Sequence, residues 1–254
     1  MTTYDTAMVN DEFDIIECRL YELQDVPNLI HVFVEADVDH QDHPKPYHLS
    51  DNLERFAPWK DRIRVVRASG LPTFAQDPDP WSRERAQREH AWTALQDAEP
   101  TDVVLHGDID EIPTPLVVRN LGGPWVGFRV LLQRLFCFAV DWEHPGQWRG
   151  TVVGHARDIE EFADMRSMRG FAQLLPNAGW HLSWLGGQEQ TLKKLGSFCH
   201  PEIADRTLEG LRSDEFMRLG YHVDGVKMNP VDVDETWPRW VSEGKCPDSW
   251  FRPR

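Results

Sequence analysis

The sequence predicts an α/β fold in which a mixed, mostly parallel central sheet is flanked by helices. Short runs of β-branched and aromatic residues, typical of buried strands, occur at 30–35, 63–66 and 103–105. Apolar residues at helical spacing predict a helix at 11–23, and Ser82 can cap a second helix at 82–96. Because strands that alternate with helices favour parallel pairing, the first half should form a largely parallel sheet and the less regular second half a mixed one.

The first predicted helix spans residues 11–23, with Asn10 as its N-cap. Pro27 ends this segment, since proline cannot continue a helix. The first strand, 30–35, ends in the carboxylate of Glu35, and a polar loop at 37–46 follows it. The apolar side chains that give the helix its periodicity are Phe13, Ile16, Leu20 and Leu23.

The helix predicted at 82–96 carries Arg85, Arg88 and Trp92 on one face, because these residues lie three and four positions apart. The arginines either clamp a phosphate group or form a surface face paired with Glu84 and Glu89. The sequence supports both interpretations equally.

Local patterns of apolar and turn-forming residues predict the remaining elements. In chain order they are a short helix at 49–56, a strand at 63–66, a loop rich in Pro and Asp at 71–80, a helical turn at 114–120, two strands within 125–140 that a hairpin would join, a strand at 151–156, a short helix at 158–165, a basic linker at 165–170, a strand at 178–185, and helices at 188–198 and 205–219. From Gly220 onward the chain is expected to be loop-like.

Composition limits the classes of function. Lys plus Arg is 27 and Asp plus Glu is 42, so the net charge is −15. Such a chain is not attracted to duplex nucleic acid, although it can hold an anionic ligand where a metal ion supplies positive charge. The four cysteines are scattered without a Cys-x-x-Cys pair, which predicts free thiols.

The sequence shows no sign of membrane insertion or export. No apolar run approaches the ~18 residues of a membrane span, and the N-terminus lacks the basic and apolar regions of a signal peptide. We therefore expect no membrane span and a cytoplasmic location.

The stretch at 101–113 is the strongest indication of function. Its apolar strand is followed by three carboxylates, those of Asp108, Asp110 and Glu111, and Pro113 is expected to stop further strand pairing. Ligands of open α/β sheets gather beyond the carboxyl ends of the strands. An Asp-x-Asp there supplies hard oxygen ligands for a divalent ion that also holds phosphate. The alternative interpretation is a solvated acidic turn.

An ordered series of short segments carries a more specific signal. It comprises Asn10-Asp11-Glu12-Phe13-Asp14-Ile15-Ile16-Glu17 with Arg19-Leu20 and Glu22-Leu23, then Val32-Phe33-Val34-Glu35, Lys45-Pro46, Asp108-x-Asp110-Glu111-Ile112-Pro113, Ala178-Gly179-Trp180-His181-x-Ser183-Trp184 and Lys194-Leu195. The series runs from about residue 9 to about residue 225. In these segments the chain resembles glycosyltransferase family 17.

The resemblance implies a GT-A fold, a divalent cation (Mn²⁺, or Mg²⁺), a UDP-sugar donor such as UDP-N-acetylglucosamine, and inversion at the anomeric carbon. It implies a single domain over 1–254, with a nucleotide-binding half at about 9–120 and an acceptor-binding half and C-terminal tail at about 121–254. The implied partners are the nucleotide-sugar donor and a glycan or other hydroxyl-bearing acceptor. The family's animal enzymes are longer through the middle, so the identity of the acceptor stays open.

In the implied mechanism, Asp110 binds the metal directly. Asp108 either binds it through water or lies near the ribose, and Glu111 braces the turn. His181, at the end of a second strand, completes the metal site through an imidazole nitrogen. The rival imidazoles are those of His200 and His106.

Cations and carboxylates at the strand edge are candidates for the nucleotide. Glu35 and Lys45 are expected at the uridine and diphosphate end, and Arg88 and Lys194 are candidates for the diphosphate. A plain surface-charge role is an equal alternative for Arg88 and Lys194.

Inverting transfer needs a carboxylate that takes the proton of the acceptor hydroxyl. Glu189, which follows Gly-Gly at a helix start, is the preferred candidate, and Asp224 and Asp232 are alternatives. Trp180 and Trp184 either stack on the sugar or pack in the core.

Two other functions compete with a sugar transferase. A metal-dependent phosphoesterase or nuclease would use Asp108, Asp110 and Glu111 with a second metal ion and more ligands nearby. A carbohydrate-binding protein without catalysis would use the abundant tryptophans, of which the chain has 11.

Overall fold

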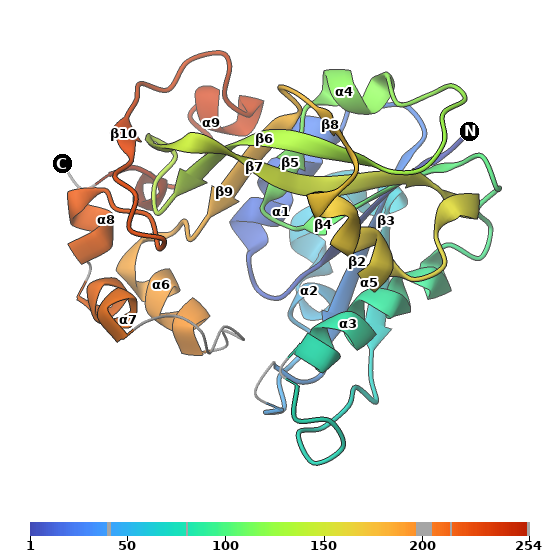
Figure 1. Cartoon of the computed structure of the whole chain (residues 1–254), viewed down its shortest axis with the longest axis horizontal. Coiled ribbons are helices and arrows are strands. Elements are labelled where there is room, and N and C mark those ends of the chain that lie inside the picture. The colour runs from blue at the N-terminus through green and yellow to red at the C-terminus, as the bar shows by residue number, and fades with distance from the viewer. Residues whose placement is uncertain (40–41, 80, 197–204, 214, 253–254) are drawn as a thin grey trace.

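In a computed structural model, the chain is described at residues 1–39, 42–79, 81–196, 205–213 and 215–252. Within these residues, a single sheet forms the centre of an α/β fold (Figure 1). Its strands lie in the order β3-β2-β1-β4-β7-β6-β9-β5, with β8 beside β6 and β10 beside β7. The strands are β1 Thr3–Met8, β2 Leu29–Ala36, β3 Ile63–Ala68, β4 Val103–Asp108, β5 Glu111–Pro113, β6 Arg129–Cys137, β7 Trp142–His155, β8 Gln173–Leu175, β9 Gly179–Ser183 and β10 Asn229–Pro230.

The half of the sheet from β3 to β4 is entirely parallel, as predicted. Its central strand, β1, was not predicted. Asp5 in the middle of β1 is fully buried, and an acidic residue inside a strand runs against β propensity. β4 is longer than predicted and ends at Asp108, which places the acidic motif at the edge where the parallel strands end.

The other half of the sheet is mixed and corrects two predictions. The region 125–140 holds one strand, β6, and its hairpin partner is the long strand β7, which absorbs the strand predicted at 151–156. Pro113 does not stop the pairing, because β5 pairs with β9 at the edge of the sheet, where proline is tolerated. This pairing sets His181 opposite Glu111.

Helices cover both faces of the sheet (Figure 1). In β2, Phe33 packs in the core cluster that α1 and the C-terminal tail complete, whereas Val32 and Val34 pack in the cluster beneath α3 and α5. The α-helices are α1 Phe13–Leu23, α2 His48–Asp51, α3 Trp81–Glu89, α4 Pro115–Arg119, α5 Phe162–Ser167, α6 Gly187–Gly196, α7 Asp205–Arg212, α8 Glu215–Leu219 and α9 Arg239–Ser242, and 3-10 turns occupy 53–62, 90–94, 156–158, 168–170 and 248–250.

Four helix predictions need correction. The helix predicted at 82–96 is α-helical only as far as Glu89, and residues 90–94 form a 3-10 turn. Glu12, not Asn10, holds the N-cap position of α1, and no side chain caps the helix there. The helix predicted at 205–219 is divided into α7 and α8. The tail beyond residue 220 is not only loop, since it contains α9 and buries Trp240 and Trp250 against α1.

Two predictions from composition can be compared with the structure. Cys18, Cys137 and Cys246 are buried free thiols, as predicted, and Cys199 lies outside the described residues. Across the described part of the chain, no helix has the length and apolar character needed to cross a membrane.

Candidate active site

Asp108 is the last residue of β4, and Asp110 lies in the turn that leads to β5. The buried side chain of Arg19 of α1 holds this turn from the side that faces the core. Nε and Nη2 of Arg19 donate to the two carboxylate oxygens of Asp5 at 2.8 and 2.5 Å, and His31 Nδ1 lies 2.8 Å from Asp5 Oδ2. Burial favours the protonated form of Asp5, but Arg19 and then His31 hold its pKa far below the ordinary value. Nη1 of Arg19 donates to three carbonyl oxygens of the turn, those of Asp108, Ile109 and Glu111, at 3.2, 3.2 and 2.8 Å.

The last residue before the motif must be glycine. A Cβ atom at Gly107 would lie 2.4 Å from Thr151 Oγ1 and 2.7 Å from Glu111 Oε2, closer than any side chain tolerates. The absence of a side chain therefore lets the Glu111 carboxylate pack under the turn, where it is fully buried.

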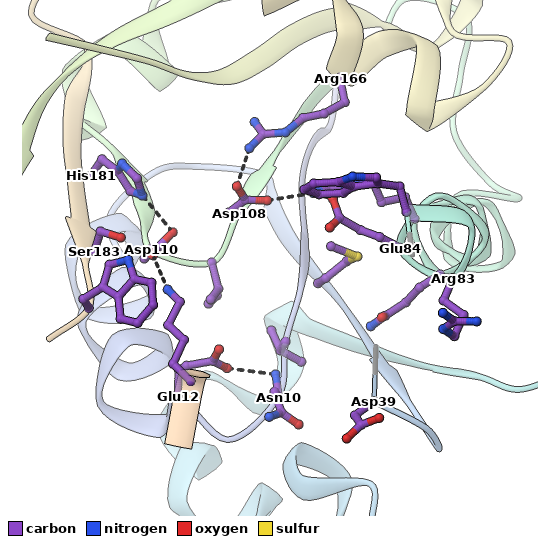
Figure 2. A pocket seen from close by; sticks show the side chains of 18 of the residues that line it. Asn10, Glu12, Asp39, Arg83, Glu84, Asp108, Asp110, Arg166, His181 and Ser183 are labelled. Atoms are coloured by element: carbon purple, nitrogen blue, oxygen red, sulfur yellow. Dashed lines mark hydrogen bonds and ion pairs between the residues drawn. The ribbon is translucent and has the colours of Figure 1, made fainter. Parts of the chain in front are cut away.

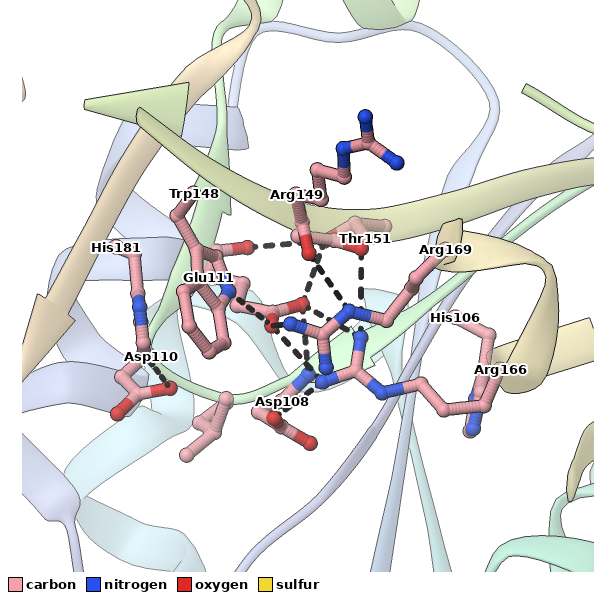
Figure 3. A network of polar contacts seen from close by, with 12 residues as sticks. His106, Asp108, Asp110, Glu111, Trp148, Arg149, Thr151, Arg166, Arg169 and His181 are labelled. Atoms are coloured by element: carbon pink, nitrogen blue, oxygen red, sulfur yellow. Dashed lines mark hydrogen bonds and ion pairs between the residues drawn. The ribbon is translucent and has the colours of Figure 1, made fainter. Parts of the chain in front are cut away.

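Two arginines, Arg88 and Arg166, hold the carboxylate of Asp108, and Figure 3 shows Arg166 beside it. Arg88 Nη2 donates to Asp108 Oδ1 at 2.8 Å, and Arg166 of α5 bonds to Asp108 Oδ2. Arg166 also forms a bidentate pair with Glu111 at 3.0 and 2.8 Å. Burial opposes ionisation of Asp108, but Arg166 and then Arg88 keep its pKa well below the ordinary value. Both oxygens of Asp108 are thus occupied by permanent cations.

Asp110 has looser contacts (Figure 2). Its Oδ1 lies 3.3 Å from His181 Nε2, and its Oδ2 lies 3.7 Å from Lys194 Nζ. Burial alone would raise the pKa of Asp110, but His181 and Lys194 hold it below its ordinary value. The Nδ1 atom of His181 is buried and has no hydrogen-bond partner in the described part of the chain.

These side chains line one cavity of about 650 Å³ at the carboxyl ends of the parallel strands (Figure 2). It brings together six of the residues singled out in the sequence, namely Lys45, Arg88, Asp108, Asp110, His181 and Lys194. Lys45 Nζ donates to Asn10 Oδ1 at 2.6 Å, and burial lowers the pKa of Lys45. The cavity is therefore rich in both cations and carboxylates.

Glu35 does not line this cavity. It accepts hydrogen bonds from the backbone N–H groups of Leu49 and Ser50, at 2.9 and 3.2 Å. These N–H groups lie at the start of α2, where the helix itself offers them no acceptor. This structural role replaces the nucleotide contact expected for Glu35.

Both ring nitrogens of His106 are engaged. Thr6 Oγ1 donates to the carbonyl oxygen of Leu105, so it accepts from His106 Nδ1 at 2.8 Å. His106 Nε2 then accepts from Arg88 Nη1 at 3.1 Å. Burial, followed by the charge of Arg88, lowers the pKa of His106 far below its ordinary value. His106 therefore offers no nitrogen to a metal ion, and the other rival, His200, lies outside the described residues.

The candidate bases are not at the Asp110 carboxylate. Glu189 and Asp232 are exposed and do not line the cavity. Asp224 lies on the turn after α8, where it contacts His222 and His144. The geometry thus gives no support to Glu189 as the base.

Trp180 and Trp184 have different environments. Trp180 packs in the core and donates from Nε1 to the carbonyl oxygen of Thr236 at 3.0 Å. Trp184 follows the end of β9 with φ of 58°, so it leaves the strand and lines the cavity beneath Lys194. The alternation expected along this strand ends at Ser183.

Several lining residues were not found from the sequence, among them Trp148, Arg166, Arg169 and His222. Trp148 Nε1 donates to Glu111 Oε1 at 2.8 Å, and its ring lies against His181. The guanidinium of Arg169 lies 4.5 Å from the ring centroid of Trp148. The signal for the arginines was present, because the basic stretch at 165–170 was noted but interpreted as a linker.

Solved structures similar to this chain include a 2-C-methyl-D-erythritol 4-phosphate cytidylyltransferase (IspD) of Francisella tularensis, at 10% identity and a TM-score of 0.36 over 69% of this chain and 90% of that one. S. aureus TarS 1-349 has 10% identity and a TM-score of 0.40 over 86% of this chain and 71% of that one. The glycosyltransferase GlyE of Streptococcus pneumoniae TIGR4 has 11% identity and a TM-score of 0.35 over 69% and 45%. These similarities are too weak to carry an argument about function.

A comparison with curated proteins finds no match. The family model for glycosyltransferase family 17, in contrast, matches residues 1–214, which include every segment of the resemblance. The predicted GT-A type of fold agrees with the observed mixed sheet and its parallel half. The chain belongs to glycosyltransferase family 17.

Proposed function

We propose that this glycosyltransferase moves a sugar, expected to be N-acetylglucosamine, from a UDP-sugar to a hydroxyl of a glycan or similar acceptor, with inversion at the anomeric carbon. The observation that carries the proposal is the convergence of the Asp110–His181 pair and several arginines on one cavity of about 650 Å³. A nucleoside diphosphate needs cations around its phosphates and donor atoms for a divalent ion. The cavity supplies both.

Asp110 and His181 fit a bound divalent cation. A carboxylate oxygen and an imidazole nitrogen face each other at 3.3 Å, a donor pair compatible with Mn²⁺ and less suited to Mg²⁺, which prefers oxygen ligands. Asp108 does not fit direct ligation because Arg88 and Arg166 hold both of its oxygens. We assign it to the ribose or to a water-mediated contact. When bound, the cation would neutralise charge on the departing diphosphate.

The diphosphate is assigned to Lys194 and Arg169, which line the cavity with side chains 38% and 25% exposed. Arg88 is only 4% exposed, so it contributes its charge mainly by orienting Asp108. Lys45 is assigned to the uridine end. Residues from both expected halves, about 9–120 and about 121–254, line the cavity, which supports a donor site shared between them.

The competing phosphoesterase function has less support. It needs a second metal ion and further ligands around Asp108, Asp110 and Glu111. In the described residues, the carboxylates of Asp108 and Glu111 share Arg166 instead of converging on a common metal position.

The test is a thermal-shift measurement with UDP and Mn²⁺. Both together should stabilise the wild-type chain by about 2.7 kcal/mol at a hundredfold excess over the dissociation constant, and either alone should stabilise it much less. Asp110→Asn should abolish the joint effect. Release of UDP from UDP-N-acetylglucosamine, with mass spectrometry of candidate acceptors, then tests the transfer.

Asp97→Asn is a matched control, since Asp97 is a surface carboxylate paired with Arg64. It should keep the full response to UDP and Mn²⁺. An unchanged response in Asp110→Asn would contradict the proposed metal position, and no response in the wild-type chain would contradict a UDP-sugar donor.

A further inference from the structure

Two histidines and a carboxylate form a cluster beside the cavity that the proposed function does not use. His144 belongs to β7, and His222 and Asp224 belong to the turn that a bridge between Tyr221 and Lys227 closes. The rings of His144 and His222 meet edge to face, with centroids 4.9 Å apart. A strand and a turn that are far apart in the sequence thus bring three proton-binding groups together.

The hydrogen bonds of the cluster define its protonation. His144 Nδ1 accepts the N–H of Gly146 at 2.9 Å, so in the neutral ring Nε2 carries the proton and faces Asp224 Oδ2 at 3.4 Å. Asp224 Oδ1 accepts the N–H of Val226 at 2.9 Å and lies 2.9 Å from His222 Nδ1. The backbone N–H of Asp224 also approaches His222 Nδ1, at 3.4 Å, but the carboxylate oxygen is much closer. We therefore assign the proton of the neutral ring to Nδ1, facing the carboxylate, and the lone pair to Nε2.

Nε2 of His222 is available to a ligand. No described residue hydrogen bonds to it, and His222 lines the cavity together with Asp110 and His181. Burial lowers the pKa of His222, Asp224 opposes this, and His144 and His181 lower it further. The ring is accordingly neutral at pH 7 and able to accept a proton.

The same three side chains could be considered as ligands of a metal ion, since one donor atom of each lies within 4.8 Å of the others. The hydrogen bond from Gly146 argues against this, because it leaves a proton on His144 Nε2, where a metal ion needs a lone pair. The pairing of His222 with Asp224 at 2.9 Å fits the contacts better, and His144 Nε2, which lies 3.4 Å from Asp224 Oδ2, makes no hydrogen bond to the described residues.

We propose that His222, oriented by Asp224, is the general base that deprotonates the acceptor hydroxyl, an inference that rests on the proposed function. The hydroxyl oxygen forms the new bond to the anomeric carbon as the bond to the UDP β-phosphate oxygen breaks, and that electron pair leaves with UDP. The hydroxyl proton passes to His222 Nε2. Asp224 stabilises the resulting imidazolium and acts as a positioning residue, and Glu189 has no part in the step.

The first experiment compares His222→Gln with wild type, using UDP-N-acetylglucosamine as the probe and UDP release as the signal. We expect kcat to fall by about 10²- to 10⁴-fold, the contribution of a general base. The KM for the donor and the thermal stabilisation by UDP with Mn²⁺ should not change. His90→Gln, in the 3-10 turn after α3, is the matched control and should keep wild-type kcat.

The second experiment measures the pH profile of Asp224→Asn. The titratable groups that face His222 are Asp224 in its own turn, His144 from β7 and His181 from β9, and Asp110 and Lys194 line the same cavity. The wild-type rate should fall as the pH drops through the pKa of His222. Because Asp224 raises that pKa, its removal should shift the acid limb to lower pH and reduce kcat by about tenfold or more.

The outcomes separate the two proposals. If His222→Gln keeps wild-type kcat, or if it loses UDP binding together with activity, His222 is not the base. If the wild-type chain neither binds UDP with Mn²⁺ nor releases UDP, the proposed function fails, and this inference fails with it. If His222→Gln does not fold, the pH profile of Asp224→Asn decides, and an unshifted acid limb overturns the inference.

Discussion

The two sides of the Asp-x-Asp turn differ in how completely their charges are paired. Behind the turn, Arg19, Asp5 and His31 are buried and make contacts of 2.5 to 2.8 Å. In the cavity, Asp110 lies 3.3 Å from His181 and 3.7 Å from Lys194. Tight contacts of buried ions fix the backbone, whereas the contacts around Asp110 are longer. We propose that similar residue types serve stability on the side of Arg19 and ligand binding on the side of the cavity.

Asp108 lies between these two cases. Its carboxylate is held by Arg88 and Arg166, yet its side chain is 36% exposed to the cavity. We propose that the first aspartate of the motif organises the cations, while the second, Asp110, binds the ligand through the cation. The predictions below test this division.

The largest expected effect is on stability, in Arg19→Met. The change leaves Asp5 as an unpaired buried charge and removes the donor that holds the turn, so the free energy of unfolding should fall by about 3–5 kcal/mol. Urea denaturation followed by circular dichroism measures it.

Arg55→Met is the matched control, because Arg55 pairs with Asp14 and Glu17 at a site where its side chain is 39% exposed. Its cost should stay below about 1 kcal/mol. Equal losses in the two variants would show that the pairing behind the turn does not hold the fold.

Local sequence patterns were sufficient for much of the fold. β2, β3 and α1 follow from apolar spacing because such spacing reports which face of an element is buried. The start of α3 was predicted from Ser82 as a capping residue, but its end was placed too far along the chain. β1 was missed because Asp5 breaks its apolar pattern, and the partner that makes the burial of Asp5 possible, Arg19, lies on another element. A pairing formed only on folding leaves no local pattern.

The candidate site shows the same limit. The Asp-x-Asp motif was found because it follows a buried strand, and His181 because a family segment marks it, and the structure brings Asp110 and His181 together. Arg166 reaches Glu111 across 55 positions of sequence, so spacing along the chain could not connect them. Glu35 was assigned to the ligand from its place at a strand end, but its side chain turns to α2 instead.

The second prediction concerns the cavity side. Arg169→Met should raise the dissociation constant for UDP with Mn²⁺ about 10- to 100-fold, the loss of one charge-assisted hydrogen bond. The free energy of unfolding should fall by about 1 kcal/mol, because Arg169 Nε donates to the carbonyl oxygen of Arg149 at 2.6 Å. The guanidinium lies 3.9 Å from Glu111, too far for a further hydrogen bond. Isothermal titration calorimetry measures the affinity.

Arg149→Met supplies the control for Arg169. Arg149 lies on β7 with its side chain directed away from Asp108 and Glu111, and it donates to the carbonyl oxygen of Gly170 (Figure 3). It should keep wild-type affinity. An equal loss in both variants would indicate a general effect of net charge and would remove Arg169 from the binding site.

The smallest expected effect is a pH dependence of stability that belongs to the side behind the turn. Burial lowers the pKa of His31 in the folded chain, although Asp5 opposes the shift. The unfolded chain therefore binds more protons below about pH 6.5, and stability falls as the pH falls from there, by at most about 1.4 kcal/mol per pH unit for this group.

The pKa of Asp5 is also lowered, but its contribution to stability is lost only as the pH falls below about 4. Burial raises the pKa of Glu22, which acts in the opposite direction because its protonated form favours the folded chain. We therefore assign the fall in stability between pH 6.5 and 5 to histidines, and urea denaturation across this range should show a flatter dependence in His31→Asn than in wild type. His43→Asn, at a site where the side chain is 69% exposed, should keep the wild-type slope. Equal slopes in wild type and His31→Asn would mean that His31 is not held neutral, and the charges behind the turn would then be no more completely paired than those in the cavity.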